Sequence, residues 1–441
     1  MREGTIGGSG RLPRRAIVAS PLIGVVSFAL MLVVARSLDL PVNDPDGGVL
    51  GSPLNLIAAV MALFIALDVV PRAVVKVRRE QVRFRPTVLA TLRERWDMRR
   101  FAIVIGALLG FYLTYVAYRN LKSYLPFAIE GTHDEALLDL DRDMAFGNDP
   151  GTLLQDVLGR GVAAHLLSFV YLAYLPLVPV SLGIAVVWQR RMHRGLWYVA
   201  AVNLSWLLGV ASYYAIPSLG PVFAEASIYS SLPETGVSRL QEVLAQHRVE
   251  VLADPHAADG VQSIAGFASL HIAIVFAAAL IAQLLGLRRW VRVTLWTFLG
   301  LTFLATIYFG WHYVVDDVAG VAIGGLAVVV AAWMTGHKLR PKRLEEGEAD
   351  VVGRGRGEQE RVDPVEHPAV GAEQGAAVLH SGRALEQGLE QVAERGGNGD
   401  GHAQQQRFAG RQPGLPDRRG GDHGPGADDD AGDEALDRLG R

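Results

Sequence analysis

Two histidines and an aspartate are the residues of this chain whose types and spacing could support catalysis. His271 follows Ser269 in the run FASLH, and His312 precedes Asp316 by four residues in HYVVDD. If a helical turn begins at His312, the carboxylate four residues later lies beside the imidazole, accepts its Nδ1–H and leaves Nε2 unprotonated. Such an imidazole could act as a nucleophile or a base, and His271 could supply a proton to a leaving group.

A basic pair on another segment could complete a phosphate site. Arg119 and Lys122 occur in the run YRNLKSYLP. Charge-assisted hydrogen bonds to phosphate are strong, and arginine can bind two oxygens at once. Taken alone, each residue also has an ordinary interpretation, as an interfacial histidine or a membrane-anchoring cation. The combination of two histidines, an aspartate at i+4 and a basic pair predicts a site, with Asp317 as a solvated neighbour.

The composition excludes several other kinds of chemistry. The 441 residues include no cysteine, which excludes disulfides, thiolate metal sites and cysteine nucleophiles. The sequence has no phosphate-loop glycine signature, no HExxH zinc motif and no serine nucleophile elbow. The net charge of -3 gives no support to nucleic-acid binding, so we predict no nucleic-acid partner. Any catalysis must therefore use His, Asp, Ser, Arg or Lys.

Long uncharged runs predict a membrane protein, and 50% of the residues are hydrophobic. A bilayer core about 30 Å thick requires roughly 20 apolar residues of helix. Every span must be helical, because an open sheet edge in lipid leaves backbone groups unpaired. We therefore predict an all-α fold, a polytopic transmembrane helical bundle of about eight spans. The runs are Ala16–Ala35, Pro53–Pro71, Phe101–Tyr118, Leu166–Trp188, Leu196–Ile216, Ile264–Leu285, Val293–Trp311 and Val318–Met334.

Loop charges predict the orientation of the bundle, since short cytoplasmic loops carry the excess of Lys and Arg. Residues 72–100 hold ten basic and three acidic residues, and the connections 189–195 and 287–292 are also basic. Residues 119–165 hold eight acidic and four basic residues, and residues 217–263 hold six and two. We predict a multi-pass protein of the plasma membrane with both termini in the cytoplasm. The first run is too long for a signal-peptide core and is interpreted as an uncleaved anchor.

The candidate residues all fall at the outer membrane face of this topology, although the topology makes no use of them. His271 is expected about two turns into the sixth span, His312 at the end of the seventh and Asp316 at the start of the eighth. Ionisable residues in or beside a span are costly, so each is a functional-site hypothesis. The site is therefore predicted to be extracytoplasmic. Asp68, near the inner end of the second span, is explained by a polar contact between helices.

At these residues the chain resembles the type 2 phosphatidic acid phosphatase superfamily, and more closely its branch related to inositol phosphorylceramide synthases. The second superfamily motif, PSGH, corresponds to ASLH ending at His271, with leucine in the glycine position as in that branch. The third motif, SRxxxxxHxxxD, corresponds to the stretch from Thr306, in place of the arginine, through His312 to Asp316. The run YYAIPSLGP, residues 213–221, is also similar to the pattern of the branch.

The resemblance covers most of residues 119–325. The first motif, KxxxxxxRP, is not present as written, and Arg119 and Lys122 occupy only its expected place after the third span. The resemblance implies a six-helix phosphatase-like core. We predict a catalytic membrane domain over residues 101–335, preceded by a two-span extension with a basic cytoplasmic loop over residues 1–100. Residues 336–441 are Gly-rich and carry mixed charges, which predicts a disordered cytoplasmic tail with a short helix around Ala384–Arg395.

The resemblance also implies a mechanism. His312 would attack phosphorus and form a phosphohistidine, Asp316 would orient it, and His271 would protonate the departing oxygen. No metal ion or cofactor is required. The phosphate oxygens would be bound by Ser269, Arg119 and Lys122.

The predicted function is an integral membrane phosphotransferase that moves a phosphoalcohol head group, such as phosphoinositol, to a lipid acceptor. Hydrolysis of a lipid phosphate or a polyprenyl pyrophosphate is the alternative, because a change of acceptor requires no change of catalytic residue. A transporter or scaffold using the same cluster is a non-enzymatic alternative, and a signalling protein acting through its tail is another. The predicted partners are a lipid phosphate and the bilayer, and the sequence predicts no oligomeric state.

Overall fold

In the computed structural model, the structure describes residues 12–43, 53–189, 191–258 and 260–339. These residues form helices and connecting loops and contain no β-strand. The predicted all-α fold is confirmed. The predicted tail, including Ala384–Arg395, lies outside the described residues apart from residues 336–339. The helices are α1 (Arg14–Ser37), α2 (Pro53–Glu80), α3 (Phe84–Arg95), α4 (Met98–Ala128), α5 (Asp134–Met144), α6 (Pro150–Leu158), α7 (Val162–Gly183), α8 (Met192–Ala215), α9 (Pro221–Ala224), α10 (Gly236–Ala253), α11 (Leu270–Leu284), α12 (Arg289–Tyr308) and α13 (Val314–Thr335), with the π-helical turn η1 (Ile184–Trp188) and the 3-10 turn η2 (Ala226–Tyr229).

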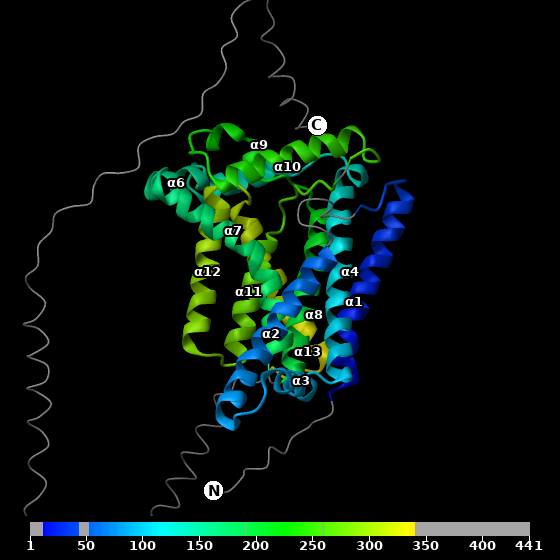
Figure 1. Ribbon diagram of the computed structural model, residues 1–441. Helices are drawn as coiled ribbons and strands as arrows, with labels where there is room; N and C mark the ends of the chain where they lie inside the picture. Colours follow the sequence, from blue (N-terminus) through cyan, green and yellow to red (C-terminus); the bar gives the residue numbers. More distant parts are fainter. Residues whose placement is uncertain (1–11, 44–52, 190, 259, 340–441) are drawn as a thin grey trace, which may run out of the picture. The chain divides into compact units, whose positions relative to one another are not determined.

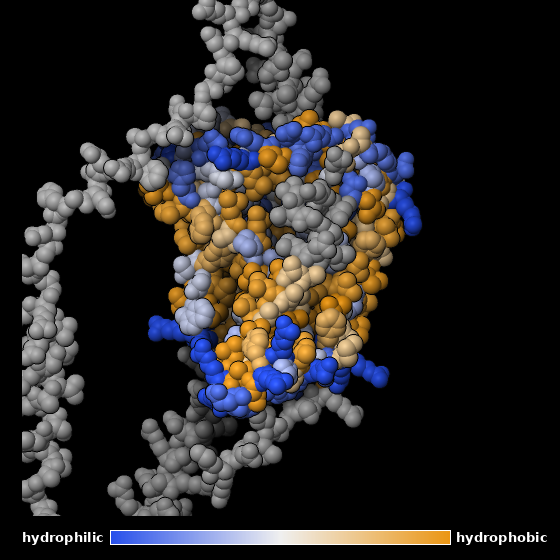
Figure 2. Space-filling view, in the orientation of Figure 1, coloured by the Kyte–Doolittle hydropathy of each residue, from blue (hydrophilic) through white to orange (hydrophobic). Residues whose placement is uncertain are grey.

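Seven helices are long and apolar enough to cross a membrane, within the described part of the chain. They are α1, α2, α4, α7 with η1, α8, α12 and α13. Figure 1 shows the long helices side by side, with α9 and α10 at one end and α3 at the other. In Figure 2, apolar side chains cover the middle of the face in view and polar side chains gather at both ends. The chain is therefore a multi-pass membrane protein. We call these ends the α10 end and the α3 end.

The sixth predicted span differs from the prediction. Its helix, α11, has 15 residues and begins at Leu270 rather than Ile264. At about 1.5 Å per residue it extends about 22 Å, less than a bilayer core of about 30 Å. The preceding residues form an irregular segment whose backbone is bound by side chains: Phe267 N donates to Ser218 Oγ at 2.9 Å and Ala268 N to Ser212 Oγ at 2.9 Å. Serine hydroxyls therefore replace the backbone bonds that a longer helix would supply.

The third predicted span is longer than expected. Helix α4 continues ten residues beyond Tyr118 and ends at Ala128. Arg119 and Lys122 therefore lie within this helix rather than in the connection after it. The contact expected for Asp68 is confirmed, since its buried carboxylate forms ion pairs with Arg72 on α2 and Arg95 on α3.

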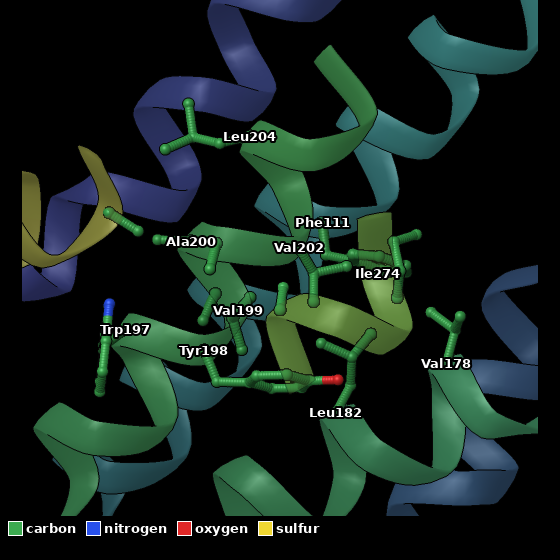
Figure 3. Close-up of a cluster of buried hydrophobic side chains, with 14 of the residues drawn as sticks. Phe111, Val178, Leu182, Trp197, Tyr198, Val199, Ala200, Val202, Leu204 and Ile274 are labelled. Carbon is green, nitrogen blue, oxygen red and sulfur yellow. The ribbon is translucent and has the colours of Figure 1, made fainter. Parts of the chain in front are cut away.

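Helix α8 is at the centre of the core and contacts most of the other long helices. Its residues Trp197, Tyr198, Val199 and Val202 are buried. Figure 3 shows side chains from α8 packed with Phe111 of α4, Val178 and Leu182 of α7, and Ile274 of α11. Trp197 Nε1 donates to Val328 O of α13 at 3.0 Å, which satisfies the indole N–H in this apolar setting.

Small residues allow α11 and α13 to approach each other closely. A β-carbon at Gly320 would collide with the Ser269 carbonyl oxygen, and one at Gly324 would collide with the Ala273 carbonyl oxygen. This glycine spacing is typical of close helix packing in membranes. Ser269 N also donates to Asp316 O at 3.0 Å. The beginnings of α11 and α13 are therefore joined through their backbones, at the place where the candidate residues lie.

Candidate active site

The two candidate histidines lie close together, although they come from different segments. His271 is the second residue of α11, and His312 lies in the connection between α12 and α13. Their ring centroids are 5.8 Å apart. The expected depth of His271 was wrong, because α11 begins one residue before it rather than two turns before. The late start of this helix places His271 at a helix N-terminus.

His312 and Asp316 are in contact, as their spacing predicted. His312 Nδ1 lies 3.5 Å from Asp316 Oδ2, and the same oxygen accepts a 3.0 Å hydrogen bond from Tyr313 N. His312 is 5% exposed and Asp316 is fully buried. The helix begins only at Val314, so the geometry is that of a capping turn rather than an internal helical turn. The backbone N–H of Tyr313, the residue after His312, thus holds the Asp316 carboxylate beside the imidazole.

His312 is neutral at ordinary pH. Burial, and to a smaller extent the charge of Lys122, lower its pKa to about 3, and a hydrogen bond with the Gly266 carbonyl opposes this shift. A neutral imidazole keeps one nitrogen lone pair free, which a nucleophile requires.

Asp317 is buried, and the expectation of a solvated neighbour was wrong. It is 0% exposed, and its Oδ2 accepts a 2.7 Å hydrogen bond from Thr306 Oγ1. Ser269 is also fully buried, with its side chain close to the Asp317 carboxyl. Thr306 occupies the place of an arginine in the motif that the sequence resembles. At this motif position the chain therefore has a threonine that donates to Asp317 beside Ser269, and no guanidinium.

Of the predicted basic pair, the structure brings Lys122 close to the histidines. Its charge acts on both His271 and His312, and its Nζ lies 4.9 Å from the ring centroid of Tyr213. No carboxylate pairs with Lys122 in the described part of the chain. Arg119 lies near Lys122, and no described contact joins it to either histidine. Of the two cations, Lys122 is therefore the one whose charge reaches both imidazoles.

Two aspartates of α5 hold the segments around the site. Asp134 accepts hydrogen bonds from Leu219 N at 2.9 Å, Gly220 N at 3.0 Å and the Tyr313 hydroxyl at 2.9 Å. Asp141 accepts from Val314 N at 3.0 Å. Burial raises the pKa of Asp141 to about 7, and this hydrogen bond opposes the rise. Neither carboxylate was singled out in the sequence, where both are part of an acidic loop. Only the folded structure shows that they fix the backbone on either side of His312.

Two tyrosines of α7 enclose His271 and were also missed. The ring centroids of Tyr171 and Tyr174 lie 4.7 Å and 4.3 Å from that of His271. Tyr171 also stacks on Trp311, with centroids 5.3 Å apart and an interplanar angle of 7°. Their spacing of three residues places them on one helix face. That spacing in an apolar run was the available signal, and it resembles ordinary core packing.

No three His, Asp or Glu side chains are grouped so that they could hold a metal ion, in the residues that the structure describes. The chemistry open to the site is that of two imidazoles, a carboxylate beside one of them, and an amine. This set can transfer a phosphoryl group through a nitrogen nucleophile, with a second imidazole for proton transfer.

Comparison with known proteins agrees with this chemistry. Residues 135–330 match the PAP2 superfamily. The matched range contains Ser269, His271, His312 and Asp316, and it excludes Arg119 and Lys122. No curated protein and no solved structure matches the chain. A PAP2 superfamily domain is consistent with a lipid phosphatase or phosphotransferase enzyme and implies a phosphate-ester substrate.

Proposed function

Because residues 135–330 of this membrane protein form a PAP2 superfamily domain, we propose that it transfers a phosphoalcohol head group from a donor lipid to a lipid acceptor, through a phosphohistidine on His312. The observation that carries the proposal is the contact of a buried, neutral His312 with Asp316, opposite a second histidine. A phosphoinositol donor, as in the inositol phosphorylceramide synthase-like branch, is part of the proposal. It is supported by the SLH form of the second motif and by the run of residues 213–221.

The first half of the reaction forms the covalent intermediate. A nitrogen of His312 bonds to phosphorus, the phosphorus–oxygen bond to the leaving alcohol breaks, and His271 gives a proton to that oxygen. Asp316 accepts the Nδ1–H of His312 and offsets the positive charge that the ring gains. Lys122 binds the phosphate oxygens together with Arg119 and with Ser269, which directly precedes α11. In phosphoryl transfer, such positioning and charge neutralisation provide most of the catalysis.

The second half regenerates His312. An acceptor hydroxyl attacks phosphorus, the bond from phosphorus to His312 breaks, and the hydroxyl proton passes to His271. Water as the acceptor makes the same site a phosphatase, which is the second candidate function. The PAP2 domain is compatible with both outcomes.

We propose that the site faces the outside of the plasma membrane. The connections from α4 to α7 and from α8 to α11, which are rich in Asp and Glu, lie at the α10 end. The basic stretches around α3, between α7 and α8 and between α11 and α12 lie at the α3 end. Basic loops are retained on the cytoplasmic side. Arg15 at the start of α1 packs against Gly336 after α13, so both ends of the described helical bundle lie at the α3 end.

The proposal is tested with purified protein and a panel of ³²P-labelled lipids: phosphatidic acid, phosphatidylinositol and a polyprenyl pyrophosphate. Each is presented with and without added diacylglycerol or ceramide. We expect turnover of at least one lipid by the wild type, and a loss of roughly 10³-fold or more in His312→Gln, since the nucleophile is removed. His193→Gln, a histidine at the α3 end, is the matched control. Turnover in His312→Gln equal to that of the wild type would contradict the mechanism.

The same assay separates the two candidate functions. A labelled lipid product that depends on the added acceptor supports transfer, and label released only into water supports hydrolysis. Lys122→Met is expected to raise KM more than it lowers kcat, because it removes a phosphate contact. Lys76→Met, which removes an exposed lysine at the α3 end, is its control.

A further inference from the structure

Tyr171 and Tyr174 on α7 are buried tyrosines whose rings contact His271. The two residues are 3% and 8% exposed, and no side-chain hydrogen bond joins either hydroxyl to another described residue. A buried tyrosine hydroxyl normally finds a partner, because leaving it unpaired costs free energy. Other tyrosines here do so: Tyr198 donates to Ser181 Oγ at 2.8 Å, and Tyr214 donates to Leu121 O at 2.8 Å. The pair beside His271 is therefore short of a partner that binding of a ligand could supply.

The position of the pair identifies the part of the substrate that it would meet. In an in-line displacement the nucleophile and the leaving oxygen lie on opposite sides of phosphorus. With His312 as the nucleophile, the leaving oxygen lies on the side of His271, which gives it a proton. Tyr171 and Tyr174 both contact the His271 ring. They therefore border the alcohol oxygen, while Lys122 is the residue that serves the phosphate.

The surroundings of the pair favour a lipid alcohol over water. The tyrosine rings, His271 and Trp311 form a continuous aromatic wall, and Phe223 packs edge-on against Trp311 at 5.8 Å. Elsewhere on the same helix, Phe169 and Leu175 are 74% and 54% exposed, as expected of side chains that face lipid. Helix α7 thus carries an apolar surface for the bilayer as well as two hydroxyls for the site. In a lipid alcohol, the apolar chain would contact the lipid-facing surface and the hydroxyl would contact the tyrosines.

We propose that Tyr171 and Tyr174 form the alcohol subsite of this enzyme. They hydrogen-bond the hydroxyl of the lipid alcohol that leaves in the first half of the reaction and of the one that attacks in the second. In the second step the hydroxyl oxygen bonds to phosphorus, the electron pair of the phosphorus–nitrogen bond returns to His312, and the hydroxyl proton passes to His271. By binding the hydroxyl of a lipid alcohol, the subsite favours that alcohol over water as the acceptor. This role rests on the proposed function.

The test measures partition between the two acceptors. Wild type, Tyr171→Phe and Tyr174→Phe react with ³²P-labelled phosphatidic acid or phosphatidylinositol in detergent micelles that contain 1-octanol as the alcohol probe. The ratio of octyl ester to label transferred to water is recorded. We expect each variant to lower this ratio about 5-fold, the effect of one lost hydrogen bond. Phenylalanine keeps the ring and the packing, and thermal midpoints of the variants verify that the fold is intact.

Controls separate this inference from the proposed function. Tyr198→Phe removes a buried hydroxyl that is bonded to Ser181, and we expect it to leave the partition ratio unchanged. A ratio unchanged in both Tyr171→Phe and Tyr174→Phe would overturn the subsite. A wild type that makes no octyl ester would also overturn it, while a hydrolase acting through His312 would stand. Turnover that survives in His312→Gln would instead contradict the proposed function.

Discussion

Buried carboxylates occur at both ends of the helical bundle, and their surroundings differ. At the α3 end, Asp68 is 1% exposed, and both of its oxygens are bonded to the guanidinium of Arg95, at 2.6 Å and 3.1 Å, with Arg72 as a further partner. At the α10 end, Asp316 and Asp317 are fully buried, and each keeps one oxygen, Oδ1, without a hydrogen-bond partner.

The difference distinguishes a structural polar cluster from a functional one. A buried charge whose hydrogen bonds are satisfied stabilises the arrangement of the helices around it. A buried carboxylate left partly unpaired is costly, so it indicates a group reserved for another partner. His312 Nδ1 is also buried without a hydrogen-bond partner, since Asp316 Oδ2 lies 3.5 Å away, beyond an ideal hydrogen-bond length. We expect these bonds to shorten when substrate binds, as apo catalytic contacts commonly do.

The largest effect that tests this comparison is expected for Asp316→Asn. The amide keeps the shape of the side chain but loses the charge that offsets a positively charged His312 ring. We expect kcat to fall roughly 10²- to 10⁴-fold with little change in the thermal midpoint. Steady-state kinetics with the best lipid of the panel, normalised to folded protein, measure this. A variant with normal kcat would place Asp316 among the structural carboxylates.

Asp68→Asn is the reciprocal change. It leaves the partly exposed guanidinium groups of Arg72 and Arg95 without their counter-ion, and we expect a loss of roughly 1–3 kcal/mol in the free energy of unfolding. The kcat of the molecules that remain folded should be unchanged. Thermal unfolding in detergent and kinetics per folded molecule test both parts. A fall in kcat without a fall in stability would show that Asp68 also has a functional role, and would contradict the contrast between a structural and a functional group of carboxylates.

A smaller effect is expected for Gly320→Ala, which tests how the site carboxylates are held. The new β-carbon would meet the Ser269 carbonyl oxygen, a backbone atom that can move only with α11. We expect a cost of roughly 1–3 kcal/mol and a several-fold fall in activity, because Ser269 and Asp316 are joined through their backbones. Gly325→Ala is the matched control, since its β-carbon would make an ordinary 3.6 Å contact with Phe276. Equal stability of the two variants would contradict the close packing.

The smallest expected effect concerns pH and Asp141, a carboxylate held by a backbone N–H without a cation. Its pKa is raised to about 7 from an ordinary 3.8, so the folded state binds the proton more tightly than the unfolded state. Its favourable contribution is fully present below pH 3.8 and is lost as the pH rises through about 7. Asp141→Asn should therefore flatten the decline in thermal midpoint between pH 5 and 8. A decline equal to that of the wild type would show that other groups cause it.

The helical membrane architecture could be predicted from the sequence because the length and hydrophobicity of a span are local properties. The contact between His312 and Asp316 was predictable for the same reason, since four residues of spacing settle it. The late start of α11 was not, because residues 264–269 are apolar enough for a helix and are held out of it by Ser212 and Ser218 from another part of the chain.

Other parts of the site depend on tertiary contacts that no local pattern records. The burial of Asp317 follows from its pairing with Thr306, eleven residues earlier on another helix. The roles of Asp134 and Asp141 depend on the folding of α5 against the segments around His312. Tyr171 and Tyr174 look like core residues until the fold shows that both of their rings contact His271. The superfamily match confirms the resemblance over residues 135–330, while the proposed branch and the boundaries of the predicted domains stay predictions.

The most direct test of the central claim is to trap the covalent intermediate. Purified protein is mixed with a ³²P-labelled donor lipid, quenched in alkaline denaturant after milliseconds to seconds, and digested to locate the label. We predict an acid-labile phosphorus adduct on the peptide that contains His312, with no such adduct in His312→Gln. A protein-bound label on a different residue, or one that persists in His312→Gln, would contradict the account.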